Sequence, residues 1–416
     1  MRVTGIVAEF NPLHNGHRHI LEKARTLTEA DCVIAVMSGD FTQRGTPALC
    51  DKHLRAEMAL KNGADIVIEL PVRASTSSAE FFAGSAVFLL DASGVVTDMI
   101  FGIESGDTIS LSRISETLLS EPDSYKRSLK DELKKGHSFP TARQSALIAA
   151  IPEMHDLPLL MSTSNNILAI EYLKALKKLG SSITPHSVQR LGAQYHDNLL
   201  HNAYSSALGI RTAIQENNNI SSIKSQLPES VYEILEKNFG KVFPVTTSDL
   251  SAMLKYRLIN AIYDGDDLCR FADVSKSISD RIEKRAISFT DPDDLISSVK
   301  TRDMTHSRIS RALLHILLGI KSPEKALDAS DSYIRILGFK QEASAVLKKM
   351  QKNASVPVIS RASDAKDVLQ GASLETFNDT LRAGDIYNKI IEEKYGTVSP
   401  GDLKRKAEIK DGLVLC

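Results

Sequence analysis

The sequence has few cysteines, and none of them lie close together. None belongs to a CxxC pair, and the four are Cys32, Cys50, Cys269 and Cys416. This spacing argues against a disulfide framework and against a structural zinc site. No apolar run is long enough to cross a bilayer, and Met1–Ile6 lacks the character of a signal peptide. We therefore expect a cytoplasmic protein without a membrane span.

The sequence also lacks an excess of charge of either sign. Lys and Arg together number 51, and Asp and Glu together number 52. Any nucleic acid would therefore have to be held by a local basic patch rather than by the overall charge. The length of 416 residues is typical of about two or three domains.

The first half of the chain alternates apolar runs with helical periodicity. Strands are predicted at Val3–Phe10, Asp31–Gly39, Asp65–Pro71 and Val95–Gly102, and amphipathic segments lie between them. A helix at 164–180 then leads into an extended segment, 181–192, which we expect to form a fifth strand. Such alternation is typical of right-handed crossovers and a parallel sheet, so the fold class is α/β and Rossmann-like.

The second half has a different pattern. After Asn217 the segments are mainly helical, and one short apolar run, Val356–Ser360, could be a strand. A polar stretch, QENNNISS, separates the two patterns. We expect a catalytic domain at 1–217 and a mainly helical domain at 218–416.

The turn after the first strand carries the sequence FNPLHNGH, from Phe10 to His17. Pro12 ends the strand, and helical spacing begins near Gly16 or His17. This places His14, Gly16 and His17 at the carboxyl end of a parallel strand, where such sheets bind their ligands.

These residue types suit phosphate chemistry. A helix N-terminus offers unpaired N–H groups and the positive end of its dipole, and Gly16 allows a ligand close to the backbone. His14 and His17 could stabilise the charge that grows on an α-phosphate as pyrophosphate leaves. Two alternatives remain open. The pair could be half of a metal site, although no third ligand is evident nearby, or simply polar residues at a helix start.

FNPLHNGH resembles the HxGH signature of the nucleotidyltransferase superfamily, which includes class I tRNA synthetases and small-molecule adenylyltransferases. The segment SSALGIR resembles the second signature of that superfamily, through Ser205, Ser206 and Arg211. The segments SGDFTQRG, NGADIVIELP, STSNNILAIEYLKAL, RLGAQYHD and YIRILGF follow in the order found in bacterial tRNA(Met) cytidine acetate ligases. This second resemblance covers nearly the whole chain.

The resemblance implies a reaction and its partners. Members of that family make acetyl-adenylate from acetate and ATP, and then acylate the exocyclic amine of the wobble cytidine of elongator tRNA(Met). ATP, acetate and elongator tRNA(Met) are the implied partners, with Mg²⁺ accompanying ATP and no other metal. We take His14, His17 and Asp40 as the candidate catalytic residues.

The resemblance also implies an ATP site, consisting of one continuous run and four residues beyond it. These residues are Val7, Ala8, Glu9, Phe10, Asn11, Pro12, Leu13, His14, Asn15, Gly16, His17, Arg18, His19, Ile20, Gly102, Asn165, Arg190 and Leu191. The residues alone leave plainer roles open for three of them. Gly102 could end a strand, Asn165 could cap a helix, and Arg190 could form a surface salt bridge.

Three further polar residues follow the second strand, at the same sheet edge as His14. Asp40 could orient a ligand or organise Mg²⁺, or it could be a turn residue. Gln43 and Arg44 could reach acetate or tRNA.

A basic segment in the second half could hold tRNA phosphates. Its cations are Lys300, Arg302, Arg308 and Arg311, and the last two are three residues apart and so share a helix face. A charged, solvated helix face is the commoner explanation of such a pattern.

Two other functions compete with the ligase. A small-molecule adenylyltransferase would join AMP to a phosphorylated cofactor precursor, but the long helical part argues against it. A non-catalytic RNA-binding module is disfavoured by the intact HNGH sequence.

Overall fold

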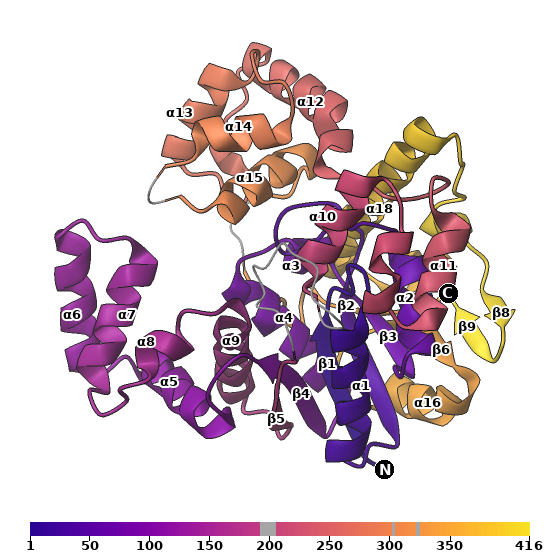
Figure 1. Cartoon of the computed structure of the whole chain (residues 1–416), viewed down its shortest axis with the longest axis horizontal. Coiled ribbons are helices and arrows are strands. Elements are labelled where there is room, and N and C mark those ends of the chain that lie inside the picture. Colours follow the sequence, from indigo (N-terminus) through magenta and orange to yellow (C-terminus); the bar gives the residue numbers. More distant parts are fainter. Residues whose placement is uncertain (192–204, 302–303, 322–324) are drawn as a thin grey trace.

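The computed structural model describes residues 1–191, 205–301, 304–321 and 325–416 (Figure 1). Its centre is one sheet in the order β5-β4-β1-β2-β3-β6-β9-β8, with β7 beside β6. The five strands of the first half are all parallel. They are β1 (Val3–Ala8), β2 (Cys32–Ser38), β3 (Ile66–Leu70), β4 (Asp98–Ile103) and β5 (Thr184–Gln189). The predicted α/β fold class and the predicted fifth strand are confirmed.

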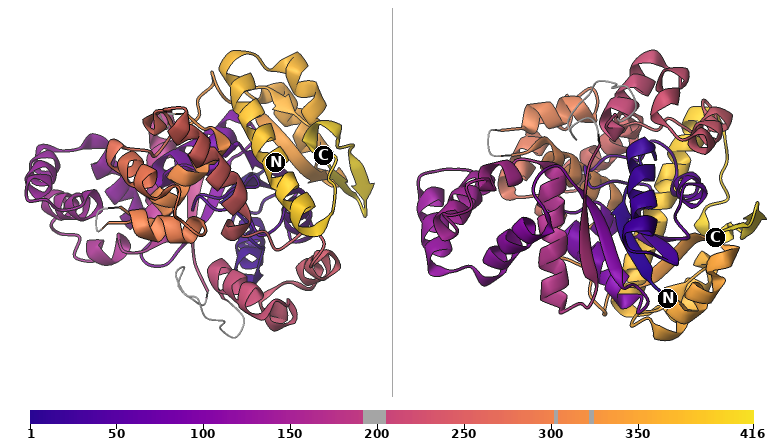
Figure 2. Two further views of the ribbon diagram at one scale, coloured as in Figure 1. Left: turned by 90° about the horizontal axis from the view of Figure 1, so that it is seen from above. Right: turned by 60° about the horizontal axis from the view of Figure 1, so that its bottom comes forward.

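Helices cover both faces of this sheet, so that every residue of β2 and β3 is buried. Ile34 and Val36 pack on the side of α4 (Ala79–Ala92) and α9 (Ser164–Leu179). Alternate residues pack on the side of α1 (Asn15–Leu27) and α2 (Lys52–Lys61). Figure 2 (right) shows α1 and α9 on opposite sides of the strands. The chain thus builds the three layers of a doubly wound fold.

Short helices extend the α9 side of the sheet. They are α5 (Thr108–Ser120), α6 (Asp123–Lys134), α7 (Phe139–Ala150) and α8 (Leu157–Leu160), and α3 (Val72–Ser75) follows β3. Helices α6 and α7 form a hairpin at the outer left of Figure 1.

The second half is mainly helical, as predicted, but it also completes the sheet. Its strands are β6 (Ile334–Lys340), β7 (Val358–Ile359), β8 (Glu408–Lys410) and β9 (Leu413–Leu415). Strand β6 pairs antiparallel with β3, and β7 confirms the strand expected near Val356. The division at 217/218 stays a prediction, but the sheet itself continues across it. Sequence reasoning missed β6 because a charged residue, Arg335, interrupts its apolar run.

The remaining helices fall into two groups. Helices α12 (Ser251–Tyr263), α13 (Lys276–Arg285), α14 (Pro292–Val299) and α15 (His306–Leu318) share an apolar core of their own. We call these four helices the helical unit, which lies at the top of Figure 1. Helices α10 (Ala207–Asn217), α11 (Glu229–Asn238), α16 (Ser344–Asn353), α17 (Ala365–Val368) and α18 (Gly371–Tyr395) pack around the sheet. None of the helices in the described ranges is long and apolar enough to cross a membrane.

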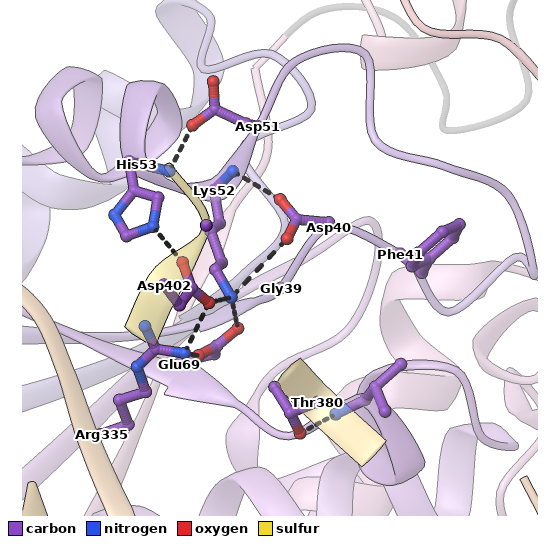
Figure 3. A network of polar contacts seen from close by, with 12 residues as sticks. Gly39, Asp40, Phe41, Asp51, Lys52, His53, Glu69, Arg335, Thr380 and Asp402 are labelled. Carbon is purple, nitrogen blue, oxygen red and sulfur yellow. Dashed lines mark hydrogen bonds and ion pairs between the residues drawn. The ribbon is translucent and has the colours of Figure 1, made fainter. Parts of the chain in front are cut away.

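A buried ion cluster joins the two halves of the chain (Figure 3). The Lys52 Nζ atom lies 2.6 Å from Asp402 Oδ2 and 2.7 Å from Glu69 Oε1. The Arg335 Nη1 atom lies 2.8 Å from Glu69 Oε2 and 2.9 Å from Asp402 Oδ2. Burial alone would lower the pKa of Lys52, but Asp402 and Glu69 outweigh burial and raise it. Lys52 therefore stays charged, and its charge holds α2, β3 and the C-terminal segment together.

We expect Lys52→Met to destabilise the protein by about 3–5 kcal/mol, because Arg335 alone cannot balance the buried charges of Glu69 and Asp402. The measurement is urea unfolding at pH 7. Lys61→Met on the same helix is the matched control, since Lys61 is more exposed and its one ion pair among the described residues is with Glu57. It should cost about 1 kcal/mol or less. Equal losses in the two variants would contradict the role given to the cluster.

Candidate active site

Two histidines build the start of α1. His14 is the N-cap residue, and the Gly16 backbone N–H donates to His14 Nδ1 at 3.1 Å. In return, the His14 backbone N–H donates to His17 Nδ1 at 3.3 Å. The two rings lie with centroids 3.8 Å apart and planes 32° apart. Histidines thus replace the Ser and Glu side chains of an ordinary capping box.

These hydrogen bonds determine which ring nitrogens carry protons. Each Nδ1 accepts a hydrogen bond, so each neutral ring carries its proton on Nε2. Burial is the main cause that lowers both histidine pKa values, and the charge of Arg190 adds to it. The pKa of His17 falls to about 3. At neutral pH the turn therefore offers two uncharged Nε2–H donors.

Gly16 is required by the position of the His14 ring. A Cβ atom at position 16 would lie 2.9 Å from His14 Cε1 and 3.1 Å from His14 Nδ1. A larger residue would push the ring away from the backbone N–H that it caps. The absence of a side chain at Gly16 therefore leaves room for the His14 ring, and also for a ligand.

A cavity lies at the carboxyl ends of the parallel strands, beside this turn. Residues of the ATP run that line it are Val7, Ala8, Glu9, Phe10, Asn11, His14, His17 and Ile20. Its cationic lining residues are Arg44, Arg190 and Arg211. Phe82, Phe101, Leu168 and Tyr172 form an apolar wall. The cavity thus combines cations, neutral donors and apolar surface, the chemistry that a nucleotide needs.

The second signature lies at the same cavity. Ser206 caps α10, and its hydroxyl accepts from the Gly209 backbone N–H at 3.0 Å. Arg211 Nη1 donates to the Asn11 carbonyl at 2.7 Å and so ties α10 to the first turn. Ser205 borders an adjoining hollow together with His14 and Gly16. The fold thus brings together two segments almost 200 residues apart in the chain.

The residues expected at the strand ends also meet there. Gly102 lies beneath Arg190, because a Cβ at 102 would be 3.1 Å from Arg190 Cγ. Asn165 does not cap its helix. Thr163 is the N-cap residue, and Asn165 Nδ2 donates to Glu104 Oε1 at 2.5 Å. Gly102, Asn165 and Arg190 line the cavity, whereas Leu191 borders the adjoining hollow.

Some residues of the expected ATP run point elsewhere. Gly16 and His19 border the adjoining hollow. Pro12 and Leu13 are buried, and Asn15 Nδ2 donates to the Ser225 carbonyl at 2.9 Å. Arg18 is exposed and pairs with Glu22. The run therefore divides into cavity residues and residues that fix the turn.

Asp40 is not among the residues that line the cavity in the described part of the chain. Its Oδ1 accepts from the Lys52 backbone N–H at 2.8 Å, so it belongs to the ion cluster. Burial raises its pKa. Gln43 and Arg44, three and four residues later, do line the cavity. The geometry thus separates Asp40 from the two histidines with which it was grouped.

The basic residues expected to bind tRNA are differently placed. Lys300 and Arg308 are exposed, and Arg302 lies outside the described residues. Arg311 is buried, with Nε and Nη2 at 2.7 and 3.1 Å from the two carboxylate oxygens of Asp273. The face that Arg308 and Arg311 share is turned to Asp273, so Arg311 has a structural partner already.

Sequence reasoning missed the apolar wall. Phe82 lies on the apolar face of α4, and Leu168 and Tyr172 lie four residues apart on α9. Apolar residues at helical spacing are typical of an ordinary core. No local signal distinguishes a core aromatic from one that lines a cavity. The metal half-site alternative gains no support, since no group of three potential metal ligands occurs within the described ranges.

We expect the added methyl group of Gly16→Ala to displace the His14 ring and so to remove its hydrogen bond to an ATP phosphate. Because a hydrogen bond to a charged group contributes about 1.5 kcal/mol or more, ATP binding should weaken by roughly tenfold or more. Calorimetric titration of ATP measures it. Gly180→Ala is the matched control, because Gly180 has φ +61 and nothing within 4 Å of its Cβ position. It should cost stability but leave ATP binding intact. Wild-type affinity in Gly16→Ala would refute the steric argument.

We expect acid to destabilise the folded protein partly through His17. In the unfolded chain the pKa of a histidine is about 6.5, whereas the pKa of the folded His17 ring is lowered to about 3. Between these values the unfolded state binds more protons, so stability must fall as the pH drops below about 6.5. Urea unfolding of wild type and His17→Gln from pH 7.5 to 5 measures this. The variant should show a shallower decline, and an identical decline would contradict the assignment.

Known proteins resemble this chain over most of its length. The model of the family described as HIGH Nucleotidyl Transferase matches residues 1–399. A tRNA(Met) cytidine acetate ligase of Caldanaerobacter subterraneus subsp. tengcongensis is 43% identical over 389 residues, covering 93% of this chain and 95% of the relative. One of Fervidobacterium nodosum is 38% identical over 429 residues, covering 98% and 99%.

Solved structures match over the same extent. Apo Thermotoga maritima TmcAL superposes with a TM-score of 0.90 at 34% identity, covering 97% of this chain and 99% of that one. TmcAL bound with alpha-thio ATP superposes with a TM-score of 0.87 at 35% identity, covering 95% and 96%. The family predicted from the motifs is confirmed. This chain belongs to the HIGH nucleotidyl transferase family and, within it, to the family of the tRNA(Met) cytidine acetate ligases.

Proposed function

We propose that this protein activates acetate with ATP and transfers the acetyl group to the exocyclic amine of the wobble cytidine of elongator tRNA(Met). The observation that carries the proposal is the pair of neutral histidine donors facing one cavity with Arg190 and Arg211. The relatives named as ligases for this tRNA, and the neighbour bound to an ATP analogue, support it.

The first step joins acetate to AMP. An acetate oxygen attacks the α-phosphorus of ATP, the bond to the bridging oxygen of the β-phosphate breaks, and pyrophosphate leaves. Negative charge grows on the phosphate oxygens, where the Nε2–H groups of His14 and His17 donate hydrogen bonds. No proton needs to move in this step, so neutral donors suit it better than acids.

The second step transfers the acetyl group. The cytidine amine attacks the carbonyl carbon of acetyl-adenylate, AMP leaves with the bonding electrons, and the amine loses one proton to solvent water. The apolar wall, which includes Phe82, Phe101 and Tyr172, offers flat surfaces suited to a nucleobase. Gln43 and Arg44 also line the cavity, and in this proposal they contact acetate or the tRNA.

Mg²⁺ would accompany ATP rather than occupy a protein cage. Glu9 is a carboxylate that lines the cavity, and its Oε1 already accepts from the Gln43 backbone N–H at 2.8 Å. Such a site suits a cation that keeps its waters and binds chiefly to phosphates, neutralising their charge. We expect the enzyme to act in the cytoplasm, where ATP and tRNA occur together.

Substitution of the histidines should separate the ligase from its alternatives. With labelled acetate, ATP and elongator tRNA(Met), the wild-type protein should label the tRNA. His14→Asn and His17→Asn should each lower acetate-dependent ATP–pyrophosphate exchange by on the order of a hundredfold, because each removes one charge-stabilising donor. His155→Asn, at an exposed position, is the matched control and should keep full exchange.

Two results would overturn the proposal. One is unchanged exchange in both histidine variants. The other is a wild-type protein that leaves tRNA unlabelled but joins AMP to a phosphorylated cofactor precursor, as a small-molecule adenylyltransferase would.

A further inference from the structure

Helix α6 carries a stripe of exposed lysines that form no ion pair within the described part of the chain. Lys126, Lys130 and Lys134 are all exposed and recur at every fourth residue, so they lie on one face about 6 Å apart along the axis. Within the described residues none of the three has a carboxylate within ion-pair distance. Of the acidic residues on this helix, Glu132 is bound to Lys135 at 2.6 Å, and Asp123 and Asp131 lie three residues before Lys126 and Lys134 without an ion pair to them in the described residues. The stripe therefore offers three cations to an external anion.

Helix α13 carries a second group of such cations. Arg281, Lys284 and Arg285 are exposed, and their spacing of three and four residues places them on one face. Again, no ion pair joins them to a carboxylate of the described chain. The acidic neighbours have other partners, since Asp280 pairs with Lys276 at 2.9 Å and Glu283 accepts from the Ser279 hydroxyl at 2.7 Å.

The helix dipole explains only part of this distribution. Cations in the last turn complement the negative end of a helix, which would account for Lys284, Arg285 and Lys134. Lys126 lies in the first turn of α6, where a cation faces the positive end of the dipole and is unfavourable. An anion outside the protein would account for the whole stripe.

The two basic helices lie on adjacent sides of the molecule in Figure 1, with α6 at the outer left and α13 on the unit at the top. Helix α13 lies on the part of the unit nearest the α6–α7 hairpin in this view. Helix α16, which also bears exposed lysines, lies near the N-terminus of the chain, at the other edge of the sheet.

We propose that α6 and α13 bind the phosphate backbone of the tRNA substrate, in place of the α15 face that the sequence suggested. The assignment rests on the proposed function. A polyanion can bind exposed cations that recur along one face of a helix, whereas Arg311 on α15 already forms an ion pair with Asp273. The chain as a whole is near neutral, so such local patches must supply the attraction.

The test compares three triple charge reversals of equal size. They are Lys126→Glu, Lys130→Glu and Lys134→Glu on α6, then Arg281→Glu, Lys284→Glu and Arg285→Glu on α13, and, as the matched control, Lys348→Glu, Lys349→Glu and Lys352→Glu on α16. The control lysines are exposed and lie at the other edge of the sheet. Filter binding of an elongator tRNA(Met) transcript is measured at several salt concentrations, beside acetate-dependent ATP–pyrophosphate exchange without tRNA.

We expect the α6 and α13 variants each to lose roughly tenfold or more in tRNA affinity. The slope of log affinity against log salt should become shallower by up to about three units, because each lost phosphate contact removes about one. The control should stay within about twofold of wild type. Exchange should be unchanged in all three, which shows that the ATP site and the fold are intact.

Each helix is judged separately against the control. If the variant of one helix binds tRNA as tightly as the control variant does, that helix does not belong to the tRNA-binding surface. A set of Lys→Gln and Arg→Gln variants separates contact from repulsion. Smaller losses in the same order support contact, whereas wild-type affinity in the Gln variants would show that Glu merely repels and would overturn the proposal. A wild-type protein that neither binds nor acetylates tRNA refutes the proposed function instead.

Discussion

The hydrogen bond from the Gly16 backbone to the His14 ring is the interaction on which the site depends. It begins α1, fixes the tautomer of His14 and holds that ring against His17. It also requires a residue without a side chain at position 16, because any Cβ would meet the ring. One local contact thus explains why histidine, glycine and histidine occur together. The helix start becomes an uncharged donor site, and the cations that line the cavity come from other elements of the fold.

A second constraint connects this site to the rest of the chain. The loop after β2 begins at Asp40 in the ion cluster, and the Gln43 backbone N–H donates to Glu9 Oε1 beside the cavity. It then passes Gly45, whose carbonyl accepts from the Ser310 hydroxyl of α15 at 2.9 Å. A side chain at position 45 would meet the Arg311 backbone. One short loop therefore contacts the cluster, the cavity and the helical unit, so the proposed tRNA surface on the helical unit is connected to the proposed ATP site.

Local pattern was enough to predict the parallel strands and the turn that carries the histidines. Buried strands in this fold are continuous apolar runs, and the HNGH sequence contains all the atoms of its own hydrogen bonds. The sequence did not show that Asp40 and Arg311 would face buried partners. Those partners, Lys52 and Asp273, are recognised only when the fold is known, since a lone charge in a sequence looks the same whether it is exposed or paired. Strand β6 was missed for the same reason, because the partners of Arg335 lie on β3 and near the C-terminus.

The apolar wall shows a related limit. Tyr172 and Phe82 are almost fully buried, yet both border the cavity. Helical periodicity reports that a residue faces inward, and it carries no information on whether the inward side is filled by protein or left for a ligand.

The central claim is that both histidines are neutral donors through Nε2 at physiological pH. Nitrogen-15 NMR of the imidazole rings tests it most directly, because protonated and unprotonated ring nitrogens have well-separated chemical shifts. At pH 7 we expect an unprotonated Nδ1 and a protonated Nε2 for both His14 and His17, with no change on lowering the pH to about 5.5, since both pKa values lie below their ordinary range. A proton on Nδ1 of either ring, or a doubly protonated ring at pH 7, would contradict it.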